Sequence, residues 1–214
     1  MMVHHKCLTR KEELLAGILL LFLASSKCYA QSFEVMPGTQ RIFIDAQYLA
    51  LFNNSPGFSL FSRARATTEY DEQTTDLFIG AYLNYTTKSG FGGTVLGRIS
   101  SFNSGVDVGG HYFKANDRFM IYALPSINLG SELLYSWFSI LRFTPKLKGD
   151  WKLYTSLELF SAFVQTGHTS SVQRIRVGVD KRGYQFGLAV NFASRGKQFE
   201  LTDTNSGVFL RKQF

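Results

Sequence analysis

The sequence predicts an all-β chain in which about ten antiparallel strands, within a range of 8 to 12, close into a transmembrane β-barrel. After the first 30 residues, no apolar stretch approaches the roughly 20 residues that a membrane-spanning helix needs. Short segments instead alternate apolar and polar side chains with period two, over about nine to thirteen residues each, as tilted membrane strands do. Their polar faces are rich in Gly, Ser, Thr, Asn and Gln rather than in charge.

Residues 1–30 have the three-part layout of a secretory signal peptide, which we expect to be cleaved. Basic residues come first, and an apolar run from Leu14 to Ala24 follows. Cys28 and Ala30 then place small residues at the −3 and −1 positions before the expected cleavage site. The apolar run is about half the length of a membrane-spanning helix, so it predicts a signal rather than an anchor.

Cysteine and charge exclude several classes of function. Cys7 and Cys28 both lie in the segment expected to be removed, so the mature chain would hold no disulfide, thiol nucleophile or cysteine-ligated metal. His111 has no neighbouring His or Cys, and we expect no metal and no cofactor. The net charge of +7 would fall to about +5 on cleavage. No basic run with interleaved aromatics indicates nucleic acid, whereas the positive balance suits anionic lipid head groups.

Residues 31–57 are expected to form a periplasmic lead-in, and 58–214 the barrel. Arg41 to Phe52 also fits a strand. Counting it would give eleven strands, whereas bacterial single-chain barrels have an even number and keep both termini in the periplasm.

Ten segments carry the alternating pattern, each bounded by turn-forming residues. In the clearest, Tyr184, Phe186 and Leu188 point one way while Gln185 and Gly187 point the other. The ten predicted strands are residues 58–70, 75–87, 91–101, 105–114, 117–127, 131–144, 150–164, 169–180, 183–194 and 205–214. The even count places the turns at 88–90, 115–116, 145–149 and 181–182 in the periplasm, and makes 195–204 the longest outer loop.

The chain ends Val208, Leu210, Lys212, Phe214, with apolar residues at alternate positions apart from Lys212 and an aromatic residue last. With the signal peptide, the cysteine-free mature chain and the aromatic-rich strands, it resembles small porin-like outer-membrane β-barrel proteins of Gram-negative bacteria. The resemblance implies a location in the bacterial outer membrane and contact with its lipid. It also implies recognition of the last strand, with Phe214 as the assembly signal, by the barrel assembly machinery.

The inward face of the predicted strands is cationic. A narrow lumen with fixed positive charge favours anions, so one expected function is a small anion-favouring channel. The other is a structural or surface barrel closed by salt-bridged side chains, because a barrel of this size is only slightly wider than those that side chains fill. No ligand is indicated. The predicted lumen charges are Arg63, Arg65, Arg98, Arg118, Arg142, Lys152, Arg174, Arg176 and Glu158, with Glu69, Asp107 and Glu132 as further acids.

Two alternatives remain open at the level of sequence. His168 and Ser170 form a His-x-Ser step similar to that of outer-membrane lipid A deacylases, which would make the chain a lipid-modifying acyl hydrolase. However, the nearest downstream acid, Asp180, lies at the other end of the predicted strand, and we assign no catalytic residue. The second alternative is a soluble lipid-carrier-like β-barrel, which would turn its apolar face inward.

Overall fold

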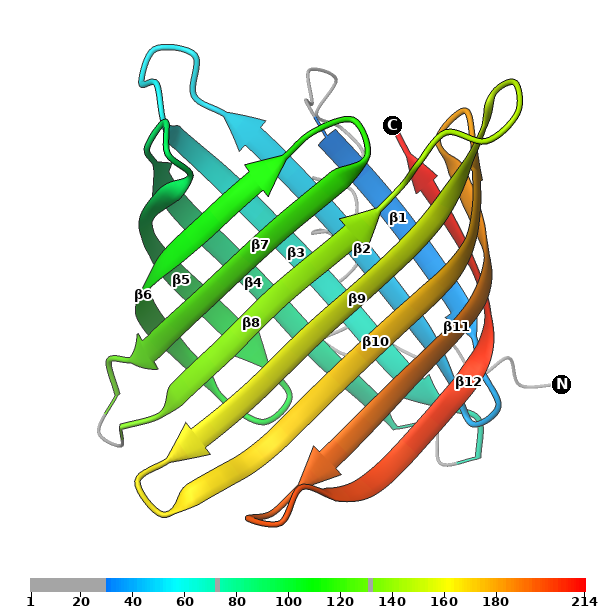
Figure 1. The fold of residues 1–214 in the computed structure, drawn as a ribbon. Helices are drawn as coiled ribbons and strands as arrows, with labels where there is room; N and C mark the ends of the chain where they lie inside the picture. The colour runs from blue at the N-terminus through cyan, green and yellow to red at the C-terminus, as the bar shows by residue number, and fades with distance from the viewer. Residues whose placement is uncertain (1–29, 72–73, 131–132) are drawn as a thin grey trace, which may run out of the picture.

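The computed structural model describes residues 30–71, 74–130 and 133–214 as twelve strands in one closed antiparallel barrel (Figure 1). Each strand pairs with its neighbours in sequence, and β1 pairs with β12 to close the barrel, from Ser32 opposite Gln213 to Val35 opposite Leu210. Among the described residues, no helix is long and apolar enough to cross a bilayer. The strands are β1 (Ala30–Pro37), β2 (Arg41–Leu51), β3 (Phe58–Glu69), β4 (Thr75–Thr86), β5 (Phe91–Ser100), β6 (Ser104–Ala115), β7 (Phe119–Asn128), β8 (Tyr135–Phe143), β9 (Trp151–Val164), β10 (Gly167–Lys181), β11 (Tyr184–Arg195) and β12 (Glu200–Gln213).

The predicted fold class is confirmed, and the ten predicted strands correspond to β3 to β12 with ends that differ by a few residues. Alternation located them because one face of each strand meets the interior and the other the surroundings. The expected signal peptide lies outside the described residues except for Ala30, which begins β1.

The predicted periplasmic lead-in is wrong for the residues that the structure describes. Residues 31–57 supply most of β1, all of β2 and the connection to β3. The argument from strand parity rejected a single additional strand, but this segment contains two, so the count stays even. The first of them ends at Pro37 and is only eight residues long, so its alternation does not stand out in the sequence.

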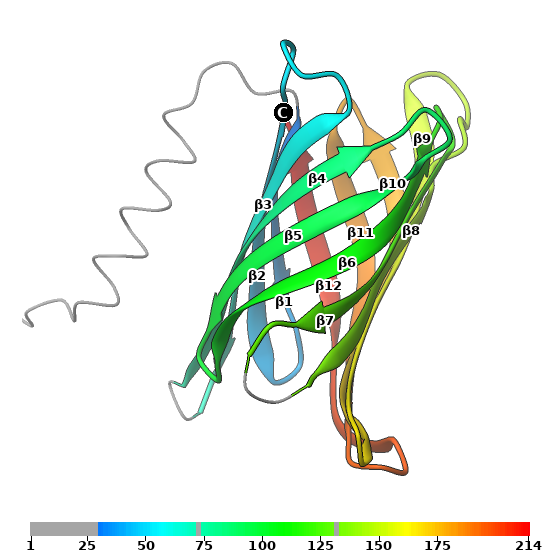
Figure 2. The same cartoon turned by 90° about the vertical axis from the view of Figure 1, so that its left-hand side faces the viewer.

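The strands are tilted, and their connections gather at two ends (Figures 1 and 2). We call the end where β1 begins and β12 stops the terminal end, and the opposite one the far end. All four turns predicted as periplasmic lie at the terminal end. The predicted longest outer loop, 195–204, is wrong, because β12 begins at Glu200 and leaves only a short connection from β11.

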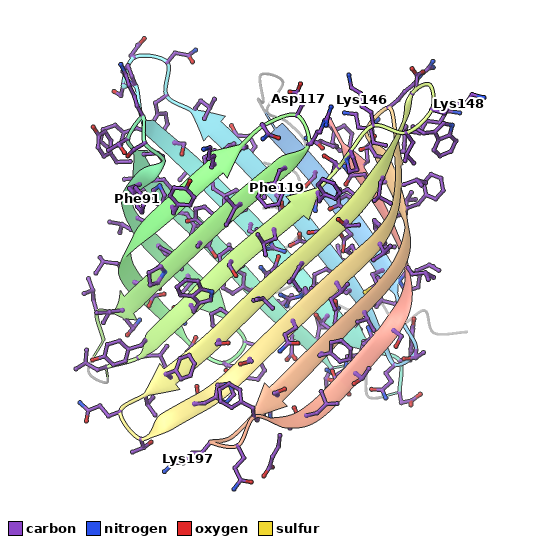
Figure 3. The ribbon with its side chains drawn as sticks, in the orientation of Figure 1. Phe91, Asp117, Phe119, Lys146, Lys148 and Lys197 are labelled. Atoms are coloured by element: carbon purple, nitrogen blue, oxygen red, sulfur yellow. The ribbon has the colours of Figure 1, made fainter. Side chains whose placement is uncertain are left out.

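The outer surface is apolar between two aromatic girdles. Leu188, Val208 and Val177 are exposed in the middle of their strands, while Figure 3 places Asp117, Lys146 and Lys148 at the terminal end and Lys197 at the far end. An apolar band bounded by aromatic rings is the pattern of a membrane-spanning barrel. Exposed aromatics include Phe58, Tyr85, Phe91, Phe119, Phe143, Trp151 and Tyr184 toward the terminal end, and Tyr70, Phe102, Tyr135, Trp137 and Phe199 toward the far end. A soluble carrier would have the reverse arrangement, so that alternative does not fit.

Candidate functional site

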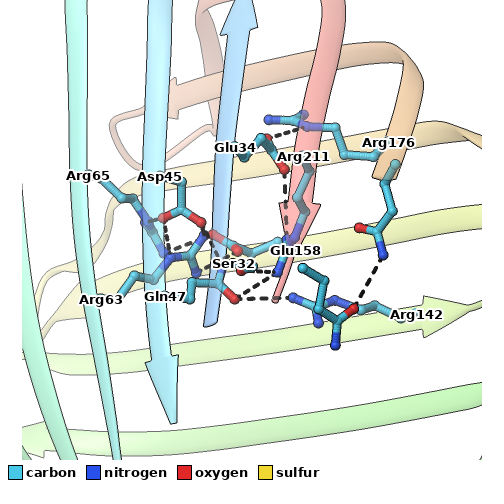
Figure 4. A network of polar contacts seen from close by, with 12 residues as sticks. Ser32, Glu34, Asp45, Gln47, Arg63, Arg65, Arg142, Glu158, Arg176 and Arg211 are labelled. Carbon is cyan, nitrogen blue, oxygen red and sulfur yellow. Dashed lines mark hydrogen bonds and ion pairs between the residues drawn. The ribbon is translucent and has the colours of Figure 1, made fainter. Parts of the chain in front are cut away.

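The barrel interior holds a group of ion pairs that joins opposite walls (Figure 4). Glu158 on β9 contacts Arg63 at 2.7 Å and Arg65 at 3.0 Å, both of which lie on β3. Six positions separate β3 from β9 around the twelve-stranded barrel, so these two strands face each other across the lumen. The side chains therefore cross the interior instead of lining one wall.

The same carboxylates bind further arginines. Arg174, on β10, contacts Glu158 at 2.6 Å. Asp45, on β2, accepts hydrogen bonds from Arg63 Nε at 2.6 Å and Nη2 at 3.1 Å, and lies 3.3 Å from Arg65 Nε. We call these five residues, Asp45, Arg63, Arg65, Glu158 and Arg174, the central partition. Its two acids and three bases leave it with a formal charge of about +1.

An amide links the central partition to two arginines nearer the terminal end. Gln47 Nε2 donates to Asp45 Oδ2 at 2.6 Å, so the Gln47 carbonyl oxygen faces the other way. That oxygen accepts from Arg211 Nη2 at 3.0 Å and from Arg142 Nη2 at 3.3 Å. The Gln47 amide thus holds one carboxylate and two guanidinium groups, which come from β2, β12 and β8.

A second acid compensates part of this charge. Glu34, buried on β1, contacts Arg176 at 2.9 Å and Arg211 at 3.7 Å. Arg211 also donates to Ser32 Oγ at 2.7 Å. Among the described residues, Arg142 forms no ion pair with a carboxylate, and its guanidinium donates to the Gln47 amide oxygen instead.

Two apolar clusters occupy the interior as well. Met36, Phe43, Tyr154, Ala189 and Phe209 pack together from β1, β2, β9, β11 and β12. The other cluster comes from the β4 to β8 side and consists of Tyr82, Leu96, Leu124, Phe138 and Ile140. Together with the central partition, these clusters fill much of the cross-section with side chains.

A cavity of about 660 Å³ lies between the central partition and the terminal end. Apolar side chains of β2, β3, β7 and β8 form its walls, and Gln47, Arg142 and Arg211 lie on its lining. Phe52, Asn53 and Pro56 of the β2–β3 connection also border it. We call it the terminal cavity.

The structure distributes the predicted lumen residues unevenly. Arg98 is apart from the network and pairs with Asp107 at 2.6 Å, while Lys152 lies half-buried near the start of β9. Arg118 is exposed in the β6–β7 turn, so its predicted place in the lumen is wrong, because the alternation of β7 starts only at Phe119. Glu69 contacts Arg41 at 2.5 Å, and Glu132 lies outside the described residues. The members found in the network are Arg63, Arg65, Arg142, Arg174, Arg176 and Glu158.

Besides Ser32, four polar residues of the network were not predicted from the sequence. Glu34, Asp45 and Gln47 lie in the segment predicted as a lead-in. Because no strand is predicted there, its side chains are not assigned to the inside or the outside of the barrel. Arg211 could have been found, because Val208, Leu210 and Lys212 alternate outward and Arg211 falls between them.

The predicted pair of His168 and Ser170 does not form. A β-bulge at Thr169 shifts the register between His168 and Ser170. His168 Nε2 lies 2.6 Å from Ser171 Oγ instead, and His168 Nδ1 lies 2.6 Å from the carbonyl oxygen of Gly196. Phe199 stacks on the imidazole with ring centroids 3.8 Å apart. Both His168 and Ser171 are buried, so the group joins β10 to the β11–β12 connection and offers no open nucleophile.

Comparisons with known proteins support the architecture. No family model matches this sequence, and no curated protein matches it significantly. A solved structure of a KdgM porin matches with a TM-score of 0.50 at 10% identity, over 86% of this chain and 98% of the porin. The KdgM porin in complex with disordered oligogalacturonate gives a TM-score of 0.48 at 11% identity, covering 86% and 98%. LpxR from Salmonella typhimurium gives 0.46 at 7% identity, covering 86% and 99%.

The chain therefore has the fold of a porin-like outer-membrane β-barrel. Its apolar outer band and polar interior agree with that fold. Together they identify the bacterial outer membrane as its location.

Proposed function

We propose that this barrel is a narrow, anion-favouring channel of the outer membrane, in which the central partition restricts passage. The observation that carries the proposal is the contact of Glu158 on one wall with Arg63 and Arg65 on the opposite wall. Side chains that meet across a lumen divide it into smaller paths, so a wide general pore is not expected.

The charge of the interior supports a preference for anions. Three more arginines, Arg142, Arg176 and Arg211, lie close to the central partition. Among the described residues, Glu34 is the one acid that forms ion pairs with any of these three. Fixed positive charge in a confined space with low-dielectric walls raises the local concentration of anions.

A structural barrel with a closed lumen is the second candidate. The two apolar clusters favour it, because Tyr82 and Phe138 approach each other to 6.4 Å between ring centroids from β4 and β8, and Tyr154 and Phe209 to 5.7 Å from β9 and β12. Such rings reduce the space available for water on either side of the central partition.

The proposal includes the partners that the chain needs to reach its place. A cleaved signal peptide would direct export, the barrel assembly machinery would recognise the last strand ending in Phe214, and outer-membrane lipid would surround the aromatic girdles. Phe214 follows β12 directly and is exposed, which leaves it accessible to such a partner.

Single-channel conductance in planar bilayers tests the proposal with Glu158→Gln. The wild type should show small steps and a reversal potential displaced toward that of chloride in a KCl gradient. The variant should conduct several-fold more and shift further toward chloride, because Arg63, Arg65 and Arg174 lose a shared carboxylate.

Glu69→Gln is the matched control, because Glu69 pairs with Arg41 in a partly exposed position outside the central partition. It should leave conductance and selectivity unchanged, and heat-modifiable migration on gels confirms folding of all three proteins. Cation selectivity would contradict the proposal. Absence of conductance in both the wild type and Glu158→Gln would favour the closed structural barrel.

A further inference from the structure

The terminal cavity combines apolar walls with a cationic inner end. Leu49, Leu51, Phe61, Met120, Tyr122 and Ile140 contribute to its walls. Its volume of about 660 Å³ falls within the roughly 300–1,000 Å³ of pockets that bind small organic ligands. Such walls favour the apolar part of a ligand, whereas the cationic inner end favours a negatively charged group on the same ligand.

Two guanidinium groups at the inner end lack part of their hydrogen-bonding complement. Arg211 is 5% exposed, and its buried Nε has no hydrogen-bond partner. The Nε of Arg142 is likewise buried without a partner. Both side chains donate to the same carbonyl oxygen of Gln47, at 3.0 and 3.3 Å, which uses both of its lone pairs.

The two cations are also short of negative charge. The carboxylate of Glu34 lies 3.7 Å from Arg211 but binds Arg176 more closely, at 2.9 Å. Arg142 has no ion pair with a carboxylate in the described part of the chain. A buried charge is costly unless it is paired and hydrogen-bonded, so a further carboxylate beside Arg142 and Arg211 would be stabilising.

The cavity opens toward the terminal end beside an ordered connection. Thr86 N donates to Gly57 O at 2.8 Å, and Phe52 N donates to Phe58 O at 3.2 Å, which fixes the β2–β3 connection against β4. Gly57 has φ +92°, and a Cβ there would lie 2.8 Å from the Thr86 carbonyl oxygen, so the turn requires glycine. The mouth therefore has a defined shape.

We propose that the terminal cavity binds an amphipathic carboxylate, with the carboxylate at Arg142 and Arg211 and the apolar body along the walls. The planar guanidinium donates two parallel hydrogen bonds to the two oxygens of a carboxylate, and the carboxylate supplies the negative charge that the inner end lacks. This inference does not depend on conduction, because binding requires the cavity and its two arginines but no open path through the central partition.

The test uses the refolded barrel in lipid nanodiscs and octanoate as the probe, measured by isothermal titration calorimetry with empty nanodiscs titrated in parallel. Octanol lacks the charge, acetate lacks the apolar body, and octyltrimethylammonium carries the opposite charge. Octanoate should bind at about one site per barrel and at least about tenfold more tightly than each of the three, as expected for a desolvated charged hydrogen bond.

Arg142→Gln locates the site. It should weaken octanoate by about tenfold or more and leave octanol unchanged. Arg118→Gln is the matched control, because Arg118 is exposed in a turn at the same end of the barrel, and it should bind octanoate like the wild type. Heat-modifiable migration establishes that each variant is folded.

Two results would overturn the proposal. One is octanol, acetate or octyltrimethylammonium binding the wild type as tightly as octanoate. The other is an unchanged octanoate affinity in folded Arg142→Gln. If that variant does not fold, Arg142→Lys retains the charge without the planar fork and should lose part of the affinity, while the comparison of probes on the wild type decides the matter without any variant.

Discussion

Three buried carboxylates of the interior, those of Glu34, Asp45 and Glu158, each contact more than one arginine. Asp45 contacts Arg63 and Arg65, and Glu158 contacts these two as well as Arg174. Removing one acid therefore leaves several guanidinium groups short of a partner at once. Because a buried cation without compensation is costly, the stability of the barrel should depend more on these acids than on any single arginine that they bind.

Asp45→Asn tests this dependence. Loss of the buried charge should lower the free energy of unfolding by about 3 kcal/mol, the scale on which broken buried ion pairs act. Urea unfolding of the barrel in lipid vesicles, followed by tryptophan fluorescence, measures the change.

Asp150→Asn is the control for that experiment. Asp150 pairs with Arg182 at 2.8 Å, but the two side chains are 59% and 77% exposed. Exposed pairs contribute about 1 kcal/mol or less, so the unfolding midpoint should hardly move. Equal effects of the two substitutions would contradict the importance assigned to the interior acids.

Sequence alone predicted the individual charged residues only as far as it predicted their strands. Arg63, Arg65, Arg174 and Arg176 were found because they alternate with outward apolar side chains. Their partners across the lumen could not be found, since a contact between β3 and β9 depends on closure of the barrel and not on local pattern. For the same reason, the terminal cavity has no counterpart in the sequence analysis.

At the scale of elements, β6 and β7 meet at an irregular point. Their pairing runs from Asp107 to Gly109 and resumes at Tyr112, leaving a gap opposite Leu124 and Pro125. Proline has no N–H to donate to a ladder. At this point the carbonyl oxygen of Pro125 approaches so closely that a Cβ on Gly109 would lie 2.2 Å from it.

Gly109→Ala should therefore separate β6 from β7 and lower the temperature at which the folded band disappears on heat-modifiability gels. Forced overpacking costs about 1–3 kcal/mol. Gly97→Ala is the control, because a Cβ at Gly97 meets nothing within 4 Å, and alanine is slightly better than glycine within a strand. Equal stability of Gly109→Ala and Gly97→Ala would contradict the prediction, because it would mean that the Pro125 carbonyl oxygen can move away from a Cβ at position 109.

Strand prediction succeeded where apolar and polar side chains alternate without interruption, and it failed where a local irregularity breaks the alternation. The segment that became β11 alternates without interruption and was located within a residue or two. In β10, the bulge at Thr169 exchanged Ser170 for Ser171 as the neighbour of His168. A bulge inserts one residue into the pattern without a distinctive sequence, so the partner of His168 could not be read from spacing alone.

For the whole molecule, the outer band determines the free energy of insertion into lipid. Leu188 is 69% exposed near the middle of β11. Leu188→Arg should destabilise the barrel by about 2–4 kcal/mol, as a cation at the bilayer midplane does, measured by urea unfolding in vesicles.

Phe102→Arg provides the comparison at the edge of the band. Phe102 is 74% exposed in the connection between β5 and β6, where an arginine reaches water and costs about 0–1 kcal/mol. A larger effect at Phe102 than at Leu188 would mean that the band lies elsewhere on the barrel.

The seam between β1 and β12 has a kinetic consequence. Its residues, such as Ser32 and Gln213, stand at opposite ends of the described part of the chain. The seam therefore cannot form as a local hairpin, and its formation carries the largest loop-closure entropy of the barrel. Until it forms, two rows of backbone N–H and C=O groups lack partners, which hydrocarbon does not tolerate. Insertion and closure should therefore be concerted, and an incomplete chain that lacks β12 should wait at the membrane surface.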